Sequence, residues 1–335
     1  MKAIVYTQHG LPITDANSLV DTDLPQPTPG PRDLLVEVRA VSVNPVDTKI
    51  RTGAPVKEPR VLGWDAAGVV RAVGSGVTLF KAGDEVFYAG SITRPGSNSE
   101  LHLVDERIVG AKPGSLGYAD AAAIPLTAIT AWELLFDRLA VPENGGDGKS
   151  LLIIGAAGGV GSMLVQLARK LTRLTVIGTA SRKETQQWVG ELGAHHVIDH
   201  SQPLQEQLQK IGLANVDIVI SLTHTGQHYA QIVEVLAPQG QFALIDDPAT
   251  LDALPLKRKS ISLHWELMFT RSMFETPDMI RQHQLLQRVS SLIDEGVIRT
   301  TLGENFGKIN ADNLRRAHAL IETGRARGKV VLEGF

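Results

Sequence analysis

Cysteine is absent from this chain of 335 residues. Its absence excludes disulfide bonds, thiolate catalysis and zinc sites built from cysteine, and it fits a reducing compartment, so we expect a cytoplasmic protein. The sequence also has no long basic run, and its net charge is −3, so neither nucleic acid nor an anionic membrane is expected as a partner. Residues 1–6 lack the apolar core of a signal peptide. The most apolar window, 119–136, contains three residues that are unfavourable in a membrane span, Asp120, Pro125 and Glu133. We expect this window to form a buried helix pair interrupted by the proline.

Length and patterning predict two domains. A chain of 335 residues is too long for one compact core. Short β-like runs between Gly- and Pro-rich turns predict a barrel-like β domain over residues 1–124. Strands and helices then alternate, which predicts a parallel sheet covered by helices over 125–264, with a possible last strand at 256–263. Residues 265–335 contain two helices and a short strand, which we expect to return to the first domain.

The stretch Leu151–Arg169 carries the most specific local signal. Four apolar residues predict a strand, a glycine-rich turn follows, and the next residues have helical spacing. Small residues stand at the three positions of the dinucleotide fingerprint, Ala156, Gly158 and Gly161. The residues expected to cradle a pyrophosphate are Gly155, Ala156, Gly158, Gly159, Val160 and Gly161. The alternative is a strand–helix turn that merely needs small residues.

The second strand of this unit indicates which dinucleotide binds. NAD-binding folds place an acidic residue about 20 positions after the glycine turn, where it holds the ribose 2′-hydroxyl. Here the strand 174–179 is followed by Ser181, Arg182 and Lys183, with no acid at its tip. A hydroxyl, a guanidinium and an ammonium favour a 2′-phosphate, so we predict NADP(H). An ordinary polar loop is the alternative.

Two further residues follow later strands of the predicted parallel sheet. Thr223 comes after the fourth strand and Ile245 after the fifth. Ligands bind at the carboxyl edge of open parallel sheets, so both are candidates for cofactor contact.

Several segments in order resemble a known family. They are Val41–Asp47, Leu62–Val70, Pro125–Trp132, Gly155–Gly161 and Gly328–Val331. Together they cover nearly the whole length, and the chain resembles the medium-chain dehydrogenase/reductase superfamily in its quinone oxidoreductase branch. Segments 223–225, 238–242 and 264–271 are similar to chains labelled zinc-type alcohol dehydrogenase-like.

The resemblance implies a fold, a cofactor position and site residues. It implies a GroES-like β-barrel catalytic domain and a Rossmann doubly wound domain, with NADPH in the cleft and its nicotinamide toward the β domain. Asn44 and Thr127 would be the catalytic residues near the nicotinamide, although each is also a plausible cap of a turn or helix. His200 would lie near the 2′-phosphate, or be an exposed loop residue, and Lys329 would reach the cofactor.

The zinc label conflicts with the residues. Zinc members of the superfamily supply ligands at positions that correspond here to Asn44 and to Gly63–Asp65, where cysteine and histidine are missing. Asp47, Asp65 and His102 are residues of types that can ligate a metal, but Asp65 is expected to hold backbone and His102 to belong to a strand face. Since zinc catalysis needs three protein ligands and an open position, we predict a zinc-independent protein with no metal site.

The predicted function is NADPH-dependent hydride transfer to a quinone or an α,β-unsaturated carbonyl compound. Such acceptors need mainly proximity and orientation, and no general acid stands out in the sequence. An enoyl-thioester reductase and a non-enzymatic NADPH-binding or sensor protein are the alternatives. The family also implies a homodimer formed through edge strands.

Overall fold

The computed structural model describes all residues, Met1–Phe335, and divides into two compact units. Unit 1 comprises Met1–Ile129 and Phe269–Phe335, and unit 2 comprises Thr130–Met268. The divisions lie a few residues after those expected at 124 and 264. The reason for the first shift is that the start of helix α3 (Pro125–Trp132) is tied to unit 1, where the backbone N–H of Leu126 donates to Asp65.

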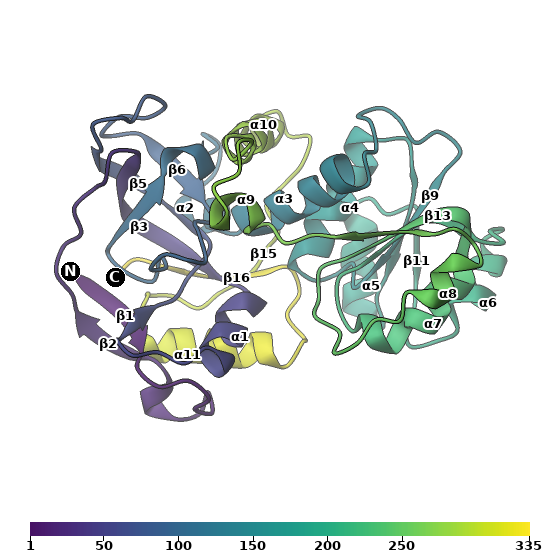
Figure 1. Ribbon diagram of the computed structural model, residues 1–335, viewed down its shortest axis with the longest axis horizontal. Helices are drawn as coiled ribbons and strands as arrows, with labels where there is room; N and C mark the ends of the chain where they lie inside the picture. Colours follow the sequence, from purple (N-terminus) through teal and green to yellow (C-terminus); the bar gives the residue numbers. More distant parts are fainter. The chain divides into compact units, whose positions relative to one another are not determined.

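Unit 1 is built on strands that pair antiparallel, except for the parallel pair β15 and β16 (Figure 1). Its strands are β1 (Lys2–Tyr6), β2 (Val20–Asp23), β3 (Asp33–Val43), β4 (Arg60–Val61), β5 (Ala66–Val73), β6 (Glu85–Tyr88), β7 (Leu101–Asp105), β8 (Val109–Ala111), β15 (Leu302–Asn305) and β16 (Lys329–Glu333). β1 is the centre of a small sheet of order β2-β1-β4. The larger sheet has the order β15-β16-β3-β5-β6-β8, and β7 also pairs with β3. The central strand β3 is buried over most of its length, which explains its run of apolar residues.

The C-terminal segment returns to unit 1, as expected from the sequence. β16 pairs antiparallel with β3, so Val331 lies opposite Ser42. The helices of unit 1 are α1 (Pro45–Gly53), α2 (Tyr118–Ala122), α9 (Thr270–Met273), α10 (Arg281–Asp294) and α11 (Ala311–Glu322). α11 packs against α1, and α10 packs against β8.

Unit 2 is a doubly wound parallel sheet. Its strands are β9 (Ser150–Ile154), β10 (Thr175–Thr179), β11 (His196–Ile198), β12 (Val216–Ser221), β13 (Leu236–Leu244) and β14 (Ser262–Trp265). Their order in the sheet is β11-β10-β9-β12-β13-β14, and every neighbouring pair is parallel. The chain therefore starts at the centre, builds outward to β11, returns to the centre and builds outward to β14. The predicted Rossmann-type sheet is confirmed.

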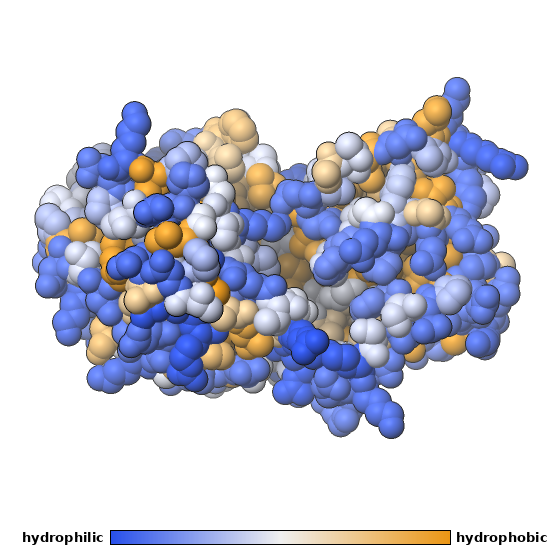
Figure 2. Space-filling model, turned by 90° about the horizontal axis from the view of Figure 1, so that it is seen from below, coloured by the Kyte–Doolittle hydropathy of each residue, from blue (hydrophilic) through white to orange (hydrophobic).

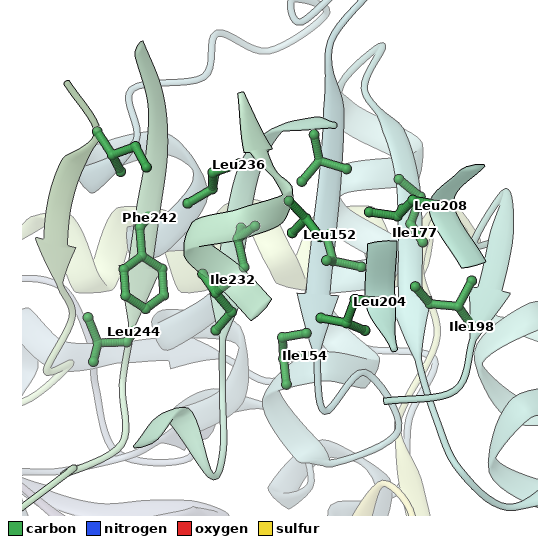
Figure 3. Packing of buried hydrophobic residues seen from close by; sticks show 14 of the residues in the cluster. Leu152, Ile154, Ile177, Ile198, Leu204, Leu208, Ile232, Leu236, Phe242 and Leu244 are labelled. Atoms are coloured by element: carbon green, nitrogen blue, oxygen red, sulfur yellow. The ribbon is translucent and has the colours of Figure 1, made fainter. Parts of the chain in front are cut away.

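One face of this sheet carries a continuous apolar core (Figure 3). The helices of unit 2 are α4 (Gly159–Leu171), α5 (Lys183–Glu191), α6 (Leu204–Lys210), α7 (Thr225–Val235) and α8 (Leu254–Lys257). Leu204 of α6 and Ile232 of α7 pack on Leu152 and Phe242 of the sheet, all four without solvent exposure. The strand residues in this core recur at every second position, as at Leu152 and Ile154, because side chains alternate between the faces of a strand.

One local prediction is wrong in detail. The run 256–263 was expected as one strand, but its start belongs to helix α8 and only β14 pairs with β13. A short apolar run has no distinctive period, so its state depends on its tertiary neighbours. The predicted break of the helix pair at Pro125 is confirmed: α2 ends at Ala122, and Pro125 begins α3, where its missing N–H is not needed.

Helix α3 continues into a π-helix, Glu133–Arg138. The helical stretch Tyr118–Arg138 is long and apolar enough to span a membrane, but 83% of its most apolar window is buried inside the structure, as in a core helix. The face of the molecule drawn in Figure 2 is mainly hydrophilic, with hydrophobic residues in separate spots.

The π-helix places two carboxyl groups together in the core of unit 2. The side chains of Glu133 and Glu266 are fully buried, and Arg138 Nε lies 2.6 Å from Glu266 Oε2. Burial and the neighbouring Glu133 raise the pKa of Glu266 to about 9. A proton therefore resides on this carboxyl pair at neutral pH, and one arginine compensates the remaining charge.

Unit 1 contains a buried histidine that is poorly satisfied. His318 of α11 has no solvent exposure, and neither ring nitrogen has a hydrogen-bond partner. Burial lowers its pKa to about 3, and the charge of Arg51 on α1 acts in the same direction. His318 is therefore neutral in the folded protein, and its unpaired nitrogens destabilise the fold.

Candidate active site

The turn after β9 has the geometry that the glycine fingerprint predicts. Gly155 has a φ of +82°, and a Cβ there would lie 2.9 Å from Thr223 Cγ2. At Gly161 a Cβ would lie 2.5 Å from the carbonyl oxygen of Gly155, so α4 can approach the turn only with glycine at this position. Helix α4 begins at Gly159 and has no acidic side chain in its first turn. Its first N–H groups and the positive end of its dipole are therefore available to an anion.

The other predicted cofactor residues follow the carboxyl ends of neighbouring strands. Ser181, Arg182 and Lys183 follow β10, His200 follows β11, Thr223 follows β12, and Ile245 follows β13. Because all these strands are parallel, the structure brings the six residues and the glycine turn to one edge of the sheet. Ser181 and Lys183 are exposed there, while Arg182 forms an ion pair of 3.4 Å with Glu184. Their contact with a cofactor stays a prediction.

Thr179 is a residue of this edge that sequence reasoning missed. Its hydroxyl accepts from the backbone N–H of Gly155 at 3.0 Å and lies 3.0 Å from His200 Nδ1. It therefore ties the glycine turn to the end of β11. Its place as the last residue of β10 was the available signal, since strand ends at this edge contact ligands.

Unit 1 contains a buried polar network around Asp65. Lys329 Nζ lies 3.0 Å from Asp65 Oδ2 and also donates to Asn44 Oδ1. Asn44 Nδ2 in turn donates to Asp65 Oδ2 at 3.1 Å. Asn44, Asp65 and Lys329 are at most 3% exposed, so the ion pair and its hydrogen bonds form without competition from water.

The two buried aspartates hold backbone segments in place. Asp65 Oδ1 accepts from the N–H of Leu126 at 2.8 Å, which confirms that Asp65 holds backbone. Asp47 accepts from the N–H groups of Asn44 at 2.7 Å and Gly63 at 2.9 Å. Burial raises the pKa of Asp47 to about 7. Burial also raises the pKa of Asp65, although the Lys329 ammonium opposes this shift.

The two predicted catalytic residues are both engaged with protein groups. The amide of Asn44 also donates to the carbonyl of Ser42 at 3.2 Å, so it is turned inward and held on both sides. Thr127 Oγ1 donates to the carbonyl of Ile124 at 3.0 Å, a bond within the first turn of α3 and not the capping contact considered as its alternative. Asp65 connects the two, because it bonds the Asn44 side chain and the residue before Thr127. Their contacts with substrate and nicotinamide stay predictions, as does that of Lys329, whose ammonium is already paired.

A zinc ion does not fit these residues. No three His, Asp or Glu side chains lie close enough together to hold a metal ion. The indole of Trp64 is fully buried and donates to the carbonyl of Ser91, and Asp65 is occupied by the Lys329 ammonium. His102, considered as a ligand, is a buried residue of β7 whose ring lies between Tyr88 and the Pro95 carbonyl. Zinc sites require three or four ligands that converge on one point.

Comparison with known proteins agrees with this architecture. Residues 30–132 match the family described as alcohol dehydrogenase GroES-like domain, and residues 192–332 match the family described as zinc-binding dehydrogenase. A zinc-type alcohol dehydrogenase-like protein of Staphylococcus aureus (strain MRSA252) is 42% identical over 312 residues, 92% of each chain.

Two solved structures are similar over the whole chain. One is a putative zinc-dependent alcohol dehydrogenase protein from Rhizobium etli CFN 42, with 59% identity, a TM-score of 0.97 and coverage of 100% of this chain and 98% of that one. The other is the quinone oxidoreductase of Escherichia coli complexed with NADPH, with 26% identity, a TM-score of 0.85 and full coverage of both chains.

Proposed function

The chain belongs to the medium-chain dehydrogenase/reductase superfamily, in its quinone oxidoreductase branch, and from this premise we propose that it is an NADPH-dependent, zinc-independent reductase of quinones or α,β-unsaturated carbonyl compounds. The observation that carries the proposal is the closed Asn44–Asp65–Lys329 network, which stands where zinc members of the superfamily supply ligands. Carbonyl reduction to an alcohol requires strong polarisation of the carbonyl oxygen. Quinones and activated alkenes accept hydride with weaker assistance.

The end of β10 supports NADP(H) as the cofactor. Ser181 and Lys183 are exposed beside Arg182, and the adjoining strand end bears no carboxylate. A hydroxyl and two cations suit a phosphate dianion, whereas NAD-binding folds place an acid here. The Escherichia coli relative was solved with NADPH, which agrees with this choice.

In the proposed reaction the cofactor supplies the hydride. The residues of this chain bind and orient it: the glycine turn and the start of α4 hold the pyrophosphate, and the bases after β10 hold the 2′-phosphate. Asn44 bonds Asp65 directly, and Thr127 follows Leu126, whose N–H donates to Asp65; we assign Asn44 and Thr127 to the nicotinamide and acceptor side. Negative charge that develops on the acceptor oxygen then needs a hydrogen-bond donor or a proton from water.

The test is steady-state NADPH oxidation with five acceptors: 1,4-benzoquinone, 9,10-phenanthrenequinone, an enone, an aldehyde and an enoyl thioester. We expect turnover with a quinone or the enone, unchanged by a chelator. Exclusive aldehyde turnover that a chelator abolishes would refute zinc independence. Tight NADPH binding without turnover of any acceptor, an enoyl thioester included, would favour the NADPH-binding or sensor alternative.

We also propose a homodimer that forms through β14. This strand is the edge of the parallel sheet, so its outer N–H and C=O groups have no strand partner. Two large apolar side chains beside it, Trp265 and Leu267, are each 51% exposed. Pairing with the same strand of a second copy would satisfy the edge and cover both side chains. Analytical ultracentrifugation tests this proposal, and a monomer at micromolar concentration would contradict it.

The cytoplasmic location of the protein remains an expectation.

A further inference from the structure

Two imidazoles meet at the carboxyl edge of the sheet in unit 2, and a third lies near enough to interact electrostatically with both. They are His200 after β11, His224 directly before α7, and His228 in the first turns of α7. α7 follows β12, which is separated from β11 in the sheet order by β10 and β9, so only the fold brings these side chains together. The ring centres of His200 and His228 are 5.7 Å apart, in an edge-to-face arrangement.

Threonine hydroxyls hold two of the three rings. His200 Nδ1 lies 3.0 Å from Thr179 Oγ1, and His224 Nδ1 lies 2.7 Å from Thr223 Oγ1. A hydroxyl both donates and accepts, so each ring can gain a proton and keep its hydrogen bond. Both threonines are also in contact with the phosphate-binding turn. Thr179 accepts from the N–H of Gly155, and a Cβ at Gly155 would touch Thr223.

The third ring retains unused hydrogen-bonding capacity. His228 Nδ1 is shielded from solvent and has no partner in the protein. A buried polar nitrogen without a partner is unfavourable, and an arriving ligand or proton can remove the deficit.

The surroundings favour the neutral forms of His200 and His228 in the free protein. Burial lowers the pKa of both His200 and His228, and repulsion between the imidazoles lowers both further. Asp199 opposes the shift at His200, and Asp246 opposes it at His228. Asp246 is already engaged, because it accepts from the N–H and hydroxyl of Thr225. Other charged groups on these elements include Asp247 after β13, Arg182 after β10, Lys183 and Glu184 at the start of α5, Glu206 and Lys210 on α6, and Glu234 on α7.

We propose that His200, His224 and His228 form a proton-linked subsite for the 2′-phosphate of the cofactor, so that binding of this phosphomonoester takes up protons from solution. The proposal rests on the proposed NADP(H) preference. A phosphate dianion beside neutral imidazoles favours their protonated forms, because an opposite charge stabilises the cation. His200 is the anchor of the subsite, since its partner Thr179 ends the strand that leads into Ser181–Lys183.

Titration calorimetry of the full-length protein with 2′,5′-ADP and 5′-AMP tests the proposal, because the two ligands differ only in the 2′-phosphate. The measurements are made at pH 6.5 and 8.0 in two buffers of different ionisation enthalpy. We expect 2′,5′-ADP to bind about tenfold more weakly at pH 8.0, with an uptake of about 0.5–1 proton at pH 7. The affinity of 5′-AMP should change less, and its proton uptake should be smaller. A site that does not titrate gives the opposite trend, because a phosphomonoester with a second pKa of about 6 gains charge as the pH rises.

Neutral variants separate the subsite from general effects. His200→Gln and, independently, His228→Gln should reduce the pH dependence and proton uptake for 2′,5′-ADP and leave 5′-AMP binding within about twofold. His264→Gln is the matched control, because His264 lies on β14 at the far edge of the same sheet. Binding of 2′,5′-ADP that strengthens with pH, or without proton uptake, would overturn the subsite and leave the NADP(H) preference intact. No binding of 2′,5′-ADP at any pH, with 5′-AMP still bound, would overturn both.

Discussion

Removal of the buried ammonium of Lys329 is the most informative perturbation of unit 1. Lys329→Met leaves Asp65 as a carboxylate without solvent exposure and without its counter-charge. Loss of one partner of a buried ion pair destabilises a protein by about 3–5 kcal/mol. The N–H of Leu126 and the amide of Asn44 still donate to Asp65, so we expect the lower end of that range, about 3 kcal/mol. For a unit of this size, this corresponds to a fall in Tm of about 6–12 °C.

The double variant Asp65→Asn/Lys329→Met separates charge balance from a role in the reaction. It removes both charges and keeps an oxygen that accepts from Leu126, so its stability should return to within about 1 kcal/mol of the wild type. Restored stability without restored turnover would show that the ammonium acts on the reaction. Restored turnover would show that it only balances Asp65.

Urea unfolding followed by far-ultraviolet circular dichroism measures these free energies. Lys308→Met is the control, because Lys308 is an exposed lysine of the same unit. The reasoning is refuted if Lys329→Met lies within about 1 kcal/mol of the wild type, or if the double variant is as unstable as the single one.

Three further predictions concern the turn and the buried titratable groups. Gly161→Ala should destabilise the protein by about 2 kcal/mol or more and weaken NADPH binding at least tenfold, because its Cβ would lie 2.5 Å from the Gly155 carbonyl oxygen. Gly226→Ala is the control, because a Cβ there meets nothing within 4 Å. Equal effects of the two substitutions on NADPH binding would contradict the prediction. His318→Leu should raise stability by about 1–2 kcal/mol at pH 7, because two unpartnered nitrogens leave the core. The folded-state pKa of His318 lies near 3, below its ordinary value of 6.5, so the stability of the wild type falls as the pH drops below 6.5. Unfolding curves at pH 7 and pH 5 should show a smaller loss of stability in His318→Leu than in the wild type. The pH dependence of stability has the opposite sign at Glu266. Its pKa is raised from 4.5 to about 9, so stability is lost as the pH rises above about 4.5. In thermal melts, Glu266→Gln should therefore stabilise the protein more at pH 8.5 than at pH 5. An equal gain at both pH values would contradict the proton assignment.

Much of unit 2 could be predicted because its signals are local. The strand, the glycine turn and the helix over 151–169 lie within one short segment, and each uses its own pattern of apolar and small residues. Parallel strands all end at the same edge, so their order along the chain already placed Ser181, Thr223 and Ile245 with the turn. The segment 254–265 was harder, because a short apolar run becomes helix or strand according to what it packs against.

The sequence by itself determined the two-domain α/β class, the glycine turn after β9 and the edge to which the predicted cofactor residues belong. These follow from periodicities and steric demands that act over a few neighbouring residues. Only the tertiary structure decided the partners of the buried charges. Lys329 meets Asn44 across 285 positions of sequence, and His200 meets His228 across two intervening strands. No local pattern encodes such pairs, because a buried charge or ring takes its partner from whichever segment the packing of the core brings within reach.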